Sequence, residues 1–67
     1  MNTKRLKGEI VAVYGTQIAF GAALGWSKNK VTRMVRGQYL PNVAEAAQIK
    51  NLLGLDVQQC EAIFFSA

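Results

Sequence analysis

The sequence is poor in the residues that most catalytic and metal sites use. It contains no histidine, one cysteine and four scattered acidic residues among 67 positions. We find no plausible pair of carboxylates, no nucleophile with a neighbouring base and no glycine loop for a phosphate, so we expect no enzymatic activity, cofactor or small-molecule substrate. Metal binding needs several ligands, so we expect no metal site either.

The lone cysteine, Cys60, has no partner for an internal disulfide. Its place on an apolar stripe favours a buried, unreactive thiol, and a free thiol indicates a reducing compartment. The longest apolar run, Ile18 to Trp26, is too short to span a membrane, and no signal-peptide core follows the basic N-terminus. We therefore expect a soluble, cytoplasmic protein without membrane contact.

The length and composition predict one small globular domain that spans residues 1–67. About half of the residues are apolar, which is typical of a folded protein rather than a disordered one. The sequence has no repeat and no low-complexity tract, so we expect no linker and no second domain.

Acidic residues are absent between Glu9 and Glu45. The basic residues of this interval are Lys28, Lys30, Arg33 and Arg36, so its local charge equals the net charge of +4. Such a surface attracts polyanions, because each neutralised phosphate releases condensed counterions. An ordinary solvated helix face is the alternative. A helix on a membrane surface is disfavoured, because Asn29 and Thr32 interrupt the basic residues and no broad apolar face accompanies them.

Apolar spacing and capping residues predict an all-α, compact five-helix fold without strands. Thr16, Ser27 and Asp56 are predicted caps, and Asn42 with Glu45 is predicted to form a capping box. The expected helices are Thr3–Tyr14, Gln17–Leu24, Lys28–Val35, a fourth between Asn42 and Gly54, and Val57–Phe65.

Residues at helical spacing are predicted to face the core. In chain order they are Leu6, Ile10 and Val13, with Tyr14 as a further candidate; Phe20 and Leu24; Val31 and Met34, with Val35 partly buried; Val43, Ala46, Ala47, Ile49, Leu52 and Leu53; and Cys60, Ile63 and Phe64.

The window from Gln17 to Gly37 contains a helix, a turn at Gly25 and a second helix that Ser27 caps and Val31 anchors. On these residues the chain resembles the Cro/CI-type (Xre-like) helix-turn-helix family, over about residues 5 to 63. The resemblance implies a lambda-repressor-like domain with its helix-turn-helix core at residues 16–36. It also implies that Gly21 lies where the two helices approach closely.

The family's base-contacting positions correspond to Lys28, Asn29, Thr32 and Arg33. The chemistry agrees, because Lys or Arg donates to guanine, Asn pairs with adenine and the Thr methyl meets the thymine methyl. Trp26 is either a partly buried core residue or a side chain that stacks on DNA sugar. The candidate phosphate contacts are Gln17, Ser27, Lys30, Arg36, Lys7 and, in a loop that is often basic in relatives, the Tyr39 hydroxyl.

The resemblance predicts a sequence-specific transcriptional regulator, a Cro-like repressor of a phage or prophage that binds a double-stranded DNA operator as a homodimer. Because the sequence ends at Ala67, we expect the short Cro-like form without a second domain. Ile63, Phe64 and Phe65 are candidate dimer contacts; a place in the core is favoured for Ile63 and Phe64, and both places stay open for Phe65. The alternative function is an Xre-like antitoxin or another protein-interaction module.

Overall fold

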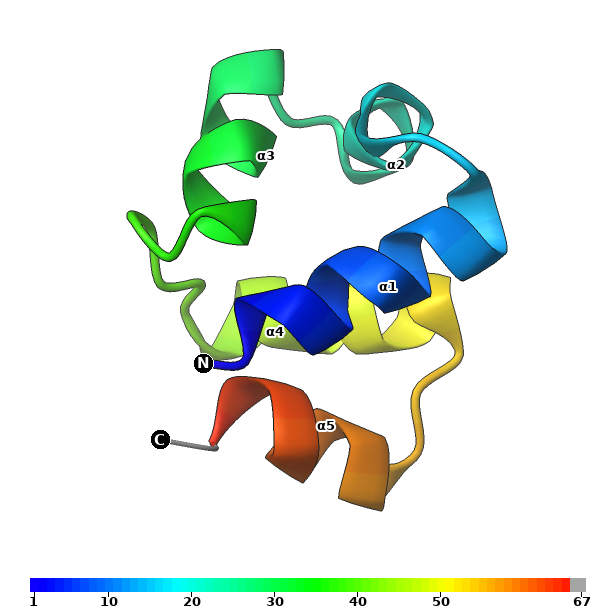
Figure 1. Cartoon of the computed structure of the whole chain (residues 1–67), viewed down its shortest axis with the longest axis vertical. Coiled ribbons are helices and arrows are strands. Elements are labelled where there is room, and N and C mark those ends of the chain that lie inside the picture. The colour runs from blue at the N-terminus through cyan, green and yellow to red at the C-terminus, as the bar shows by residue number, and fades with distance from the viewer. Residues whose placement is uncertain (66–67) are drawn as a thin grey trace.

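Five helices and no strand make up residues 1–65, the part of the chain that the computed structural model describes (Figure 1). The helices are α1 (Thr3–Tyr14), α2 (Gln17–Leu24), α3 (Lys28–Val35), α4 (Val43–Leu53) and α5 (Val57–Phe64). The predicted all-α fold is confirmed. Among the predicted helix ends, only that of the last helix was wrong, since Phe65 follows α5 with a φ of −115° and a ψ of 6°.

Each helix begins after a residue whose side chain accepts a hydrogen bond from the backbone N–H three positions later. The four predicted caps do this, and Asn2 caps α1 in the same way. Asn42 and Glu45 form the predicted capping box, and Asp56 forms a second one with Gln59. A side-chain cap of this kind stabilises a helix by about 1 kcal/mol.

Helix α1 crosses the middle of the molecule and contacts each of the other four helices (Figure 1). Helix α2 packs against α3 and α4, whereas α3 and α4 do not pack closely on each other. The start of α1 is tied to α5, because the Asn2 N–H donates to the Ile63 carbonyl at 2.6 Å. Among the helices described, α3 therefore has close packing partners on one side, that of α1 and α2.

The core lies between these helices and draws on all five of them. Phe20, Ile49 and Ile63 are fully buried, and Leu55 joins them from the turn after α4. The remaining core residues are Leu6, Ile10, Leu24, Val31, Met34 and Leu53, all of which were predicted to face inward.

Three of the predicted core positions were wrong. Val13 is 50% exposed, because the buried row of α1 continues from Ile10 to Tyr14, whose ring lies 5.3 Å from that of Phe20. Val43 is 87% exposed and Ala47 is also exposed, because α4 turns Ile49 and Leu53 toward the core instead.

Cys60 is half-buried rather than buried, since α5 lies at the edge of the fold and packs closely only on α1. None of the helices described is long and apolar enough to cross a membrane.

Candidate nucleic-acid interface

A short turn joins α2 to α3. Gly25 ends α2 in the left-handed region, with a φ of 75° and a ψ of 24°. The Trp26 N–H donates to the Gly21 carbonyl at 3.0 Å, and the Ser27 hydroxyl accepts from the Lys30 N–H at 3.2 Å. These bonds close α2 and open α3 within three residues, so the two helices have a fixed relation.

The two helices approach each other closely at Gly21 and Val31. A Cβ atom placed on Gly21 would lie 3.0 Å from Cγ2 of Val31, and Gly21 itself is buried. This close approach was predicted from the resemblance. It means that the buried Val31 sets the depth at which α3 sits on α2.

The helical period divides α3 into an inward and an outward face. Val31 and Met34 point into the core. Thr32 and Lys30 are half-buried at the two borders of the helix. The exposed residues are Lys28, Asn29, Arg33 and Arg36, the last of them just beyond the helix. Three of the four predicted base contacts are therefore exposed, and the fourth, Thr32, lies at the border.

A groove of about 370 Å³ runs beside the start of α3. Lys28 and Thr32 line it from α3, Gln17 and Ile18 from the start of α2, and Val11 from α1. Its apolar side includes Ile18, which is 67% exposed. The structure thus brings the predicted phosphate contact Gln17 beside two predicted base contacts.

Lys7 lies on the same row of α1 as Thr3 and Val11, because residues four apart share a helix face. Val11 lines the groove at the start of α3, and Thr3 lies against the end of that helix, 3.6 Å from a Cβ placed on Gly37. The exposed Lys7 therefore lies along the α1 edge that borders α3.

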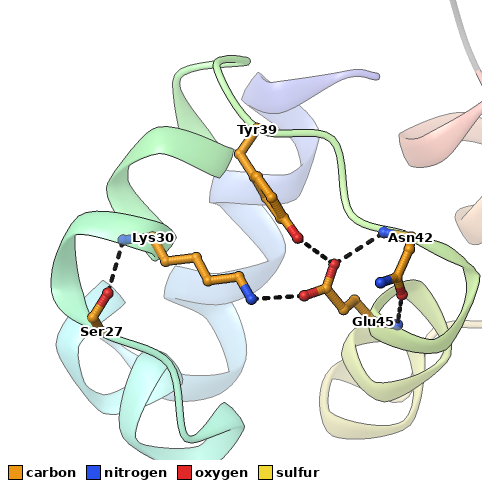
Figure 2. A network of polar contacts seen from close by, with 5 residues as sticks. All are labelled: Ser27, Lys30, Tyr39, Asn42 and Glu45. Atoms are coloured by element: carbon orange, nitrogen blue, oxygen red, sulfur yellow. Dashed lines mark hydrogen bonds and ion pairs between the residues drawn. The ribbon is translucent and has the colours of Figure 1, made fainter.

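Lys30 points away from the outward face, toward α4 (Figure 2). Its Nζ atom lies 2.7 Å from Oε2 of Glu45, 4.2 Å from the ring centroid of Trp26 and 5.2 Å from that of Tyr39. The two rings meet edge to face at 6.0 Å. The half-buried Trp26 thus packs on the core, and the Lys30 ammonium lies over the Trp26 ring.

Tyr39 also binds Glu45 instead of facing outward. Its hydroxyl donates to Oε1 of Glu45 at 2.6 Å, and the Asn42 N–H donates to the same oxygen at 3.0 Å. Two predicted phosphate contacts, Lys30 and Tyr39, are therefore brought together on one carboxylate. We call Lys30, Tyr39, Glu45 and Trp26 the Glu45 cluster.

The cluster shifts the pKa values of its three titratable members, Glu45, Lys30 and Tyr39. Hydrogen bonds from Lys30, Tyr39 and the Asn42 backbone lower the pKa of Glu45 from 4.5 to about 2. The bond to Glu45 raises the pKa of Lys30, and it raises that of Tyr39 as well, with a further contribution from burial. Glu45 is therefore a carboxylate and Lys30 an ammonium at neutral pH.

Comparison with known proteins assigns the chain to a family. All of residues 1–67 match the family described as "Protein of unknown function (DUF739)". The chain belongs to this family. No curated protein and no solved structure matches it. Within residues 1–65, this DUF739 protein has no group of three side chains that could hold a metal ion.

The sequence of the DUF739 protein did not predict that Glu45 binds Lys30 and Tyr39. It predicted the capping box with Asn42, but the partner Lys30 lies 15 positions earlier, on another helix. The available signal was that Glu45 is the first acidic residue after the acid-free interval. Its return to α3 neutralises one of the four charges of that interval.

The predicted dimer contacts separate clearly. Ile63 is fully buried and therefore belongs to the core, Phe64 is half-buried, and Phe65 is 80% exposed. An apolar groove of about 190 Å³ lies beside the two phenylalanines. Leu40 and Val43, which also line it, are 70% and 87% exposed. We call Leu40, Val43 and Phe65 the apolar patch.

Proposed function

We propose that this DUF739 protein is a sequence-specific DNA-binding transcriptional regulator of the Cro/CI type. In this proposal α2 and α3 act as a helix-turn-helix unit within residues 16–36, and α3 enters the major groove of an operator. The outward face of α3 carries the proposal. Its exposed side chains are Lys28, Asn29 and Arg33, and the exposed Arg36 follows directly after the helix, which packs on α2 through Val31. A helix of this size fits the major groove.

Base readout is assigned to Lys28, Asn29, Thr32 and Arg33. Lys28 or Arg33 donates to guanine O6 and N7, and Asn29 pairs with adenine through its amide. Thr32, at the edge of the groove beside α3, offers its methyl group to thymine. These contacts supply sequence preference rather than most of the affinity.

Phosphate contacts are assigned to the side chains around this face. Arg36 follows α3, Ser27 precedes it, and Lys7 lies along the neighbouring edge of α1. Gln17 opens α2, where free backbone N–H groups and the helix dipole favour an anion. Lys30 and Tyr39 are omitted, because Glu45 accepts their hydrogen bonds.

We further propose that two copies bind one operator and block polymerase. Related half-sites lie about one helical turn apart, roughly 34 Å. The apolar patch supports this arrangement, because Phe65 is exposed beside Leu40 and Val43.

Binding of the purified protein to its own flanking genomic DNA, at several salt concentrations, tests the proposal. We expect specific retention. Arg33→Ala or Asn29→Ala should cost about 1–3 kcal/mol and relax the base preference. Arg36→Ala should weaken all duplexes alike and lower the salt slope by about 0.9. Lys50→Ala, which removes a charge from α4, is the control. If the Arg33, Asn29 and Arg36 variants all lost the same affinity on every DNA, the assigned roles would be wrong.

A protein-binding module, such as an antitoxin, is the second candidate. The apolar patch favours it, since its three side chains are 70–87% exposed and border one groove. Two results together would support this function over DNA recognition. A defined second polypeptide would copurify with the wild type but not with Phe65→Ser, and the protein would prefer no duplex.

A further inference from the structure

We infer that Glu45 is a positioning and specificity-determining residue for α3. In this inference it holds Lys30 away from DNA phosphates and fixes α3 against α4, so that the helix selects a base sequence instead of binding any duplex through its charge. The inference rests on the proposed DNA-binding function.

Glu45 joins three separate parts of the chain. Its Oε2 atom accepts from Lys30 of α3 at 2.7 Å, and its Oε1 atom accepts from the Tyr39 hydroxyl at 2.6 Å and from the Asn42 N–H at 3.0 Å (Figure 2). The Glu45 side chain is only 14% exposed. Both oxygens are therefore engaged, and the carboxylate has a single well-defined orientation.

The Lys30 ammonium contacts two aromatic rings as well as the carboxylate, and its side chain is 36% exposed. It lies over Trp26 at 4.2 Å and beside Tyr39 at 5.2 Å, so two aromatic rings and one carboxylate hold it on the side of α4. A lysine on this border of α3 would otherwise be free to swing toward a nearby phosphate. Its long, flexible side chain and compact charge suit a phosphate contact that carries no sequence information.

The cluster also connects two helices that do not otherwise pack closely on each other. Helix α3 packs closely on α1 and α2 but not on α4. The bond between Lys30 and Glu45 supplies that missing link. A helix held in its binding orientation loses less conformational freedom on binding, which favours the one duplex that fits it.

Glu45→Gln keeps the size of the side chain and an acceptor for Tyr39 and Asn42, but it removes the charge that holds Lys30. We expect Lys30 then to contact DNA without regard to sequence. Binding to a scrambled duplex should tighten, and its salt slope should steepen by about 0.9. Between ~50 and ~200 mM salt this equals an additional loss of affinity of about 3.5-fold.

The experiment measures binding to the best flanking-DNA duplex and to a scrambled duplex of equal length. Glu61→Gln is the matched control, because it removes one negative charge from an exposed position on α5. Circular dichroism establishes that each variant is folded. The scrambled-to-specific ratio of Kd values should fall several-fold in Glu45→Gln and stay near the wild-type value in Glu61→Gln.

The double variant Lys30→Met with Glu45→Gln separates charge from position. It has the net charge of the wild type, so its salt slope should match the wild-type slope. Its scrambled-to-specific ratio should still fall, because the link between α3 and α4 is gone. If that ratio were unchanged, the positioning role would be wrong.

Two further outcomes would overturn the inference. In the first, the wild type prefers one duplex, but Glu45→Gln has the wild-type salt slope and the wild-type ratio of Kd values. That result would contradict the inference and leave the proposed function standing. The same holds if Lys30→Met lowered the slope by about 0.9 on every duplex, because Lys30 would then be a phosphate contact in the wild type. A wild-type protein that prefers no duplex would overturn the proposed function and the inference together.

Discussion

Two side-chain contacts of α3, one apolar and one ionic, join it to α2 and to α4. Val31 lies against Gly21 on the side of α2, and Lys30 pairs with Glu45 on the side of α4. The apolar contact does not depend on pH, whereas the ionic contact needs a charged carboxylate. The two contacts can therefore be tested separately.

The contribution of Glu45 to stability should depend on pH in the acid range. Its pKa is lowered from 4.5 to about 2, so the stabilisation is fully present above pH 4.5 and is lost as the pH falls toward about 2. The difference in Tm between wild type and Glu45→Gln should be largest at neutral pH and shrink across this window.

Lys30 and Tyr39 face Glu45 and do not titrate in this range, because their hydrogen bonds to Glu45 raise the pKa of Lys30 above 10.5 and that of Tyr39 above 10.0. Glu61→Gln controls for the general loss of a negative charge. A difference in Tm between wild type and Glu45→Gln that stayed constant from pH 7 to pH 2 would contradict the prediction.

Gly21 and Val31 should be energetically coupled. Alanine at position 21 gains about 1 kcal/mol of helix propensity, but its Cβ would press on Cγ2 of Val31. Valine cannot readily turn away, because its χ1 angle is restricted in a helix. The effect of Gly21→Ala on the free energy of unfolding should thus be more favourable by about 1 kcal/mol in a Val31→Ala background than in the wild type. Urea unfolding of the four proteins of this cycle measures the coupling, and additive effects would show that the contact is loose.

At the scale of helices, local sequence is sufficient to start and stop the elements. Thr16 and Ser27 provide starts for α2 and α3, and Gly25 provides the stop between them. The backbone of Gly25 has a positive φ that side chains with a Cβ adopt only at a cost. The turn that relates α2 to α3 therefore depends on one glycine.

Gly25→Ala should destabilise the fold by about 1–2 kcal/mol. A Cβ atom there would meet no other atom within 4 Å, so the cost is that of the backbone alone. Gly54→Ala is a matched comparison, because Gly54 also has a positive φ of 64° and open space around it. Gly25→Asn should cost less, because asparagine tolerates this conformation. Unfolding in urea measures each change, and a neutral Gly25→Ala would contradict the assignment.

At the scale of the whole molecule, α1 joins the other helices and leaves two different surfaces open. One is the cationic face of α3, and the other is the apolar patch near the end of α5. Two such surfaces on one small domain are consistent with one that binds DNA and one that binds a second copy.

Self-association through the apolar patch should weaken in Val43→Ser and in Phe65→Ser. Removing exposed apolar surface lowers the gain from burying it at an interface. Val57→Ser is the control, because Val57 is 64% exposed on α5 but does not line the groove of the patch. Sedimentation velocity across a concentration range, with and without DNA, measures the effect. An equal effect of all three substitutions would place the contact elsewhere.

Much of the fold could be predicted because its information is local. Helix starts depend on residues three positions apart, and the rows Leu6–Ile10 and Phe20–Leu24 follow one helical period. Val13 and Val43 were misplaced because periodicity identifies an apolar stripe but not its edges. Whether a residue at the edge is covered depends on which helix lies opposite, and that is a property of tertiary packing.

The sequence by itself determined the five helices, their caps, the glycine turn and the cationic exposed residues of α3, because each follows from neighbours within about one turn. Only the tertiary structure decided that Ile63 is core, that Phe65 lies beside Val43, and that Lys30 is bound by Glu45. These contacts join residues of different helices. Their distances depend on how the helices pack, and no local spacing in the sequence records that.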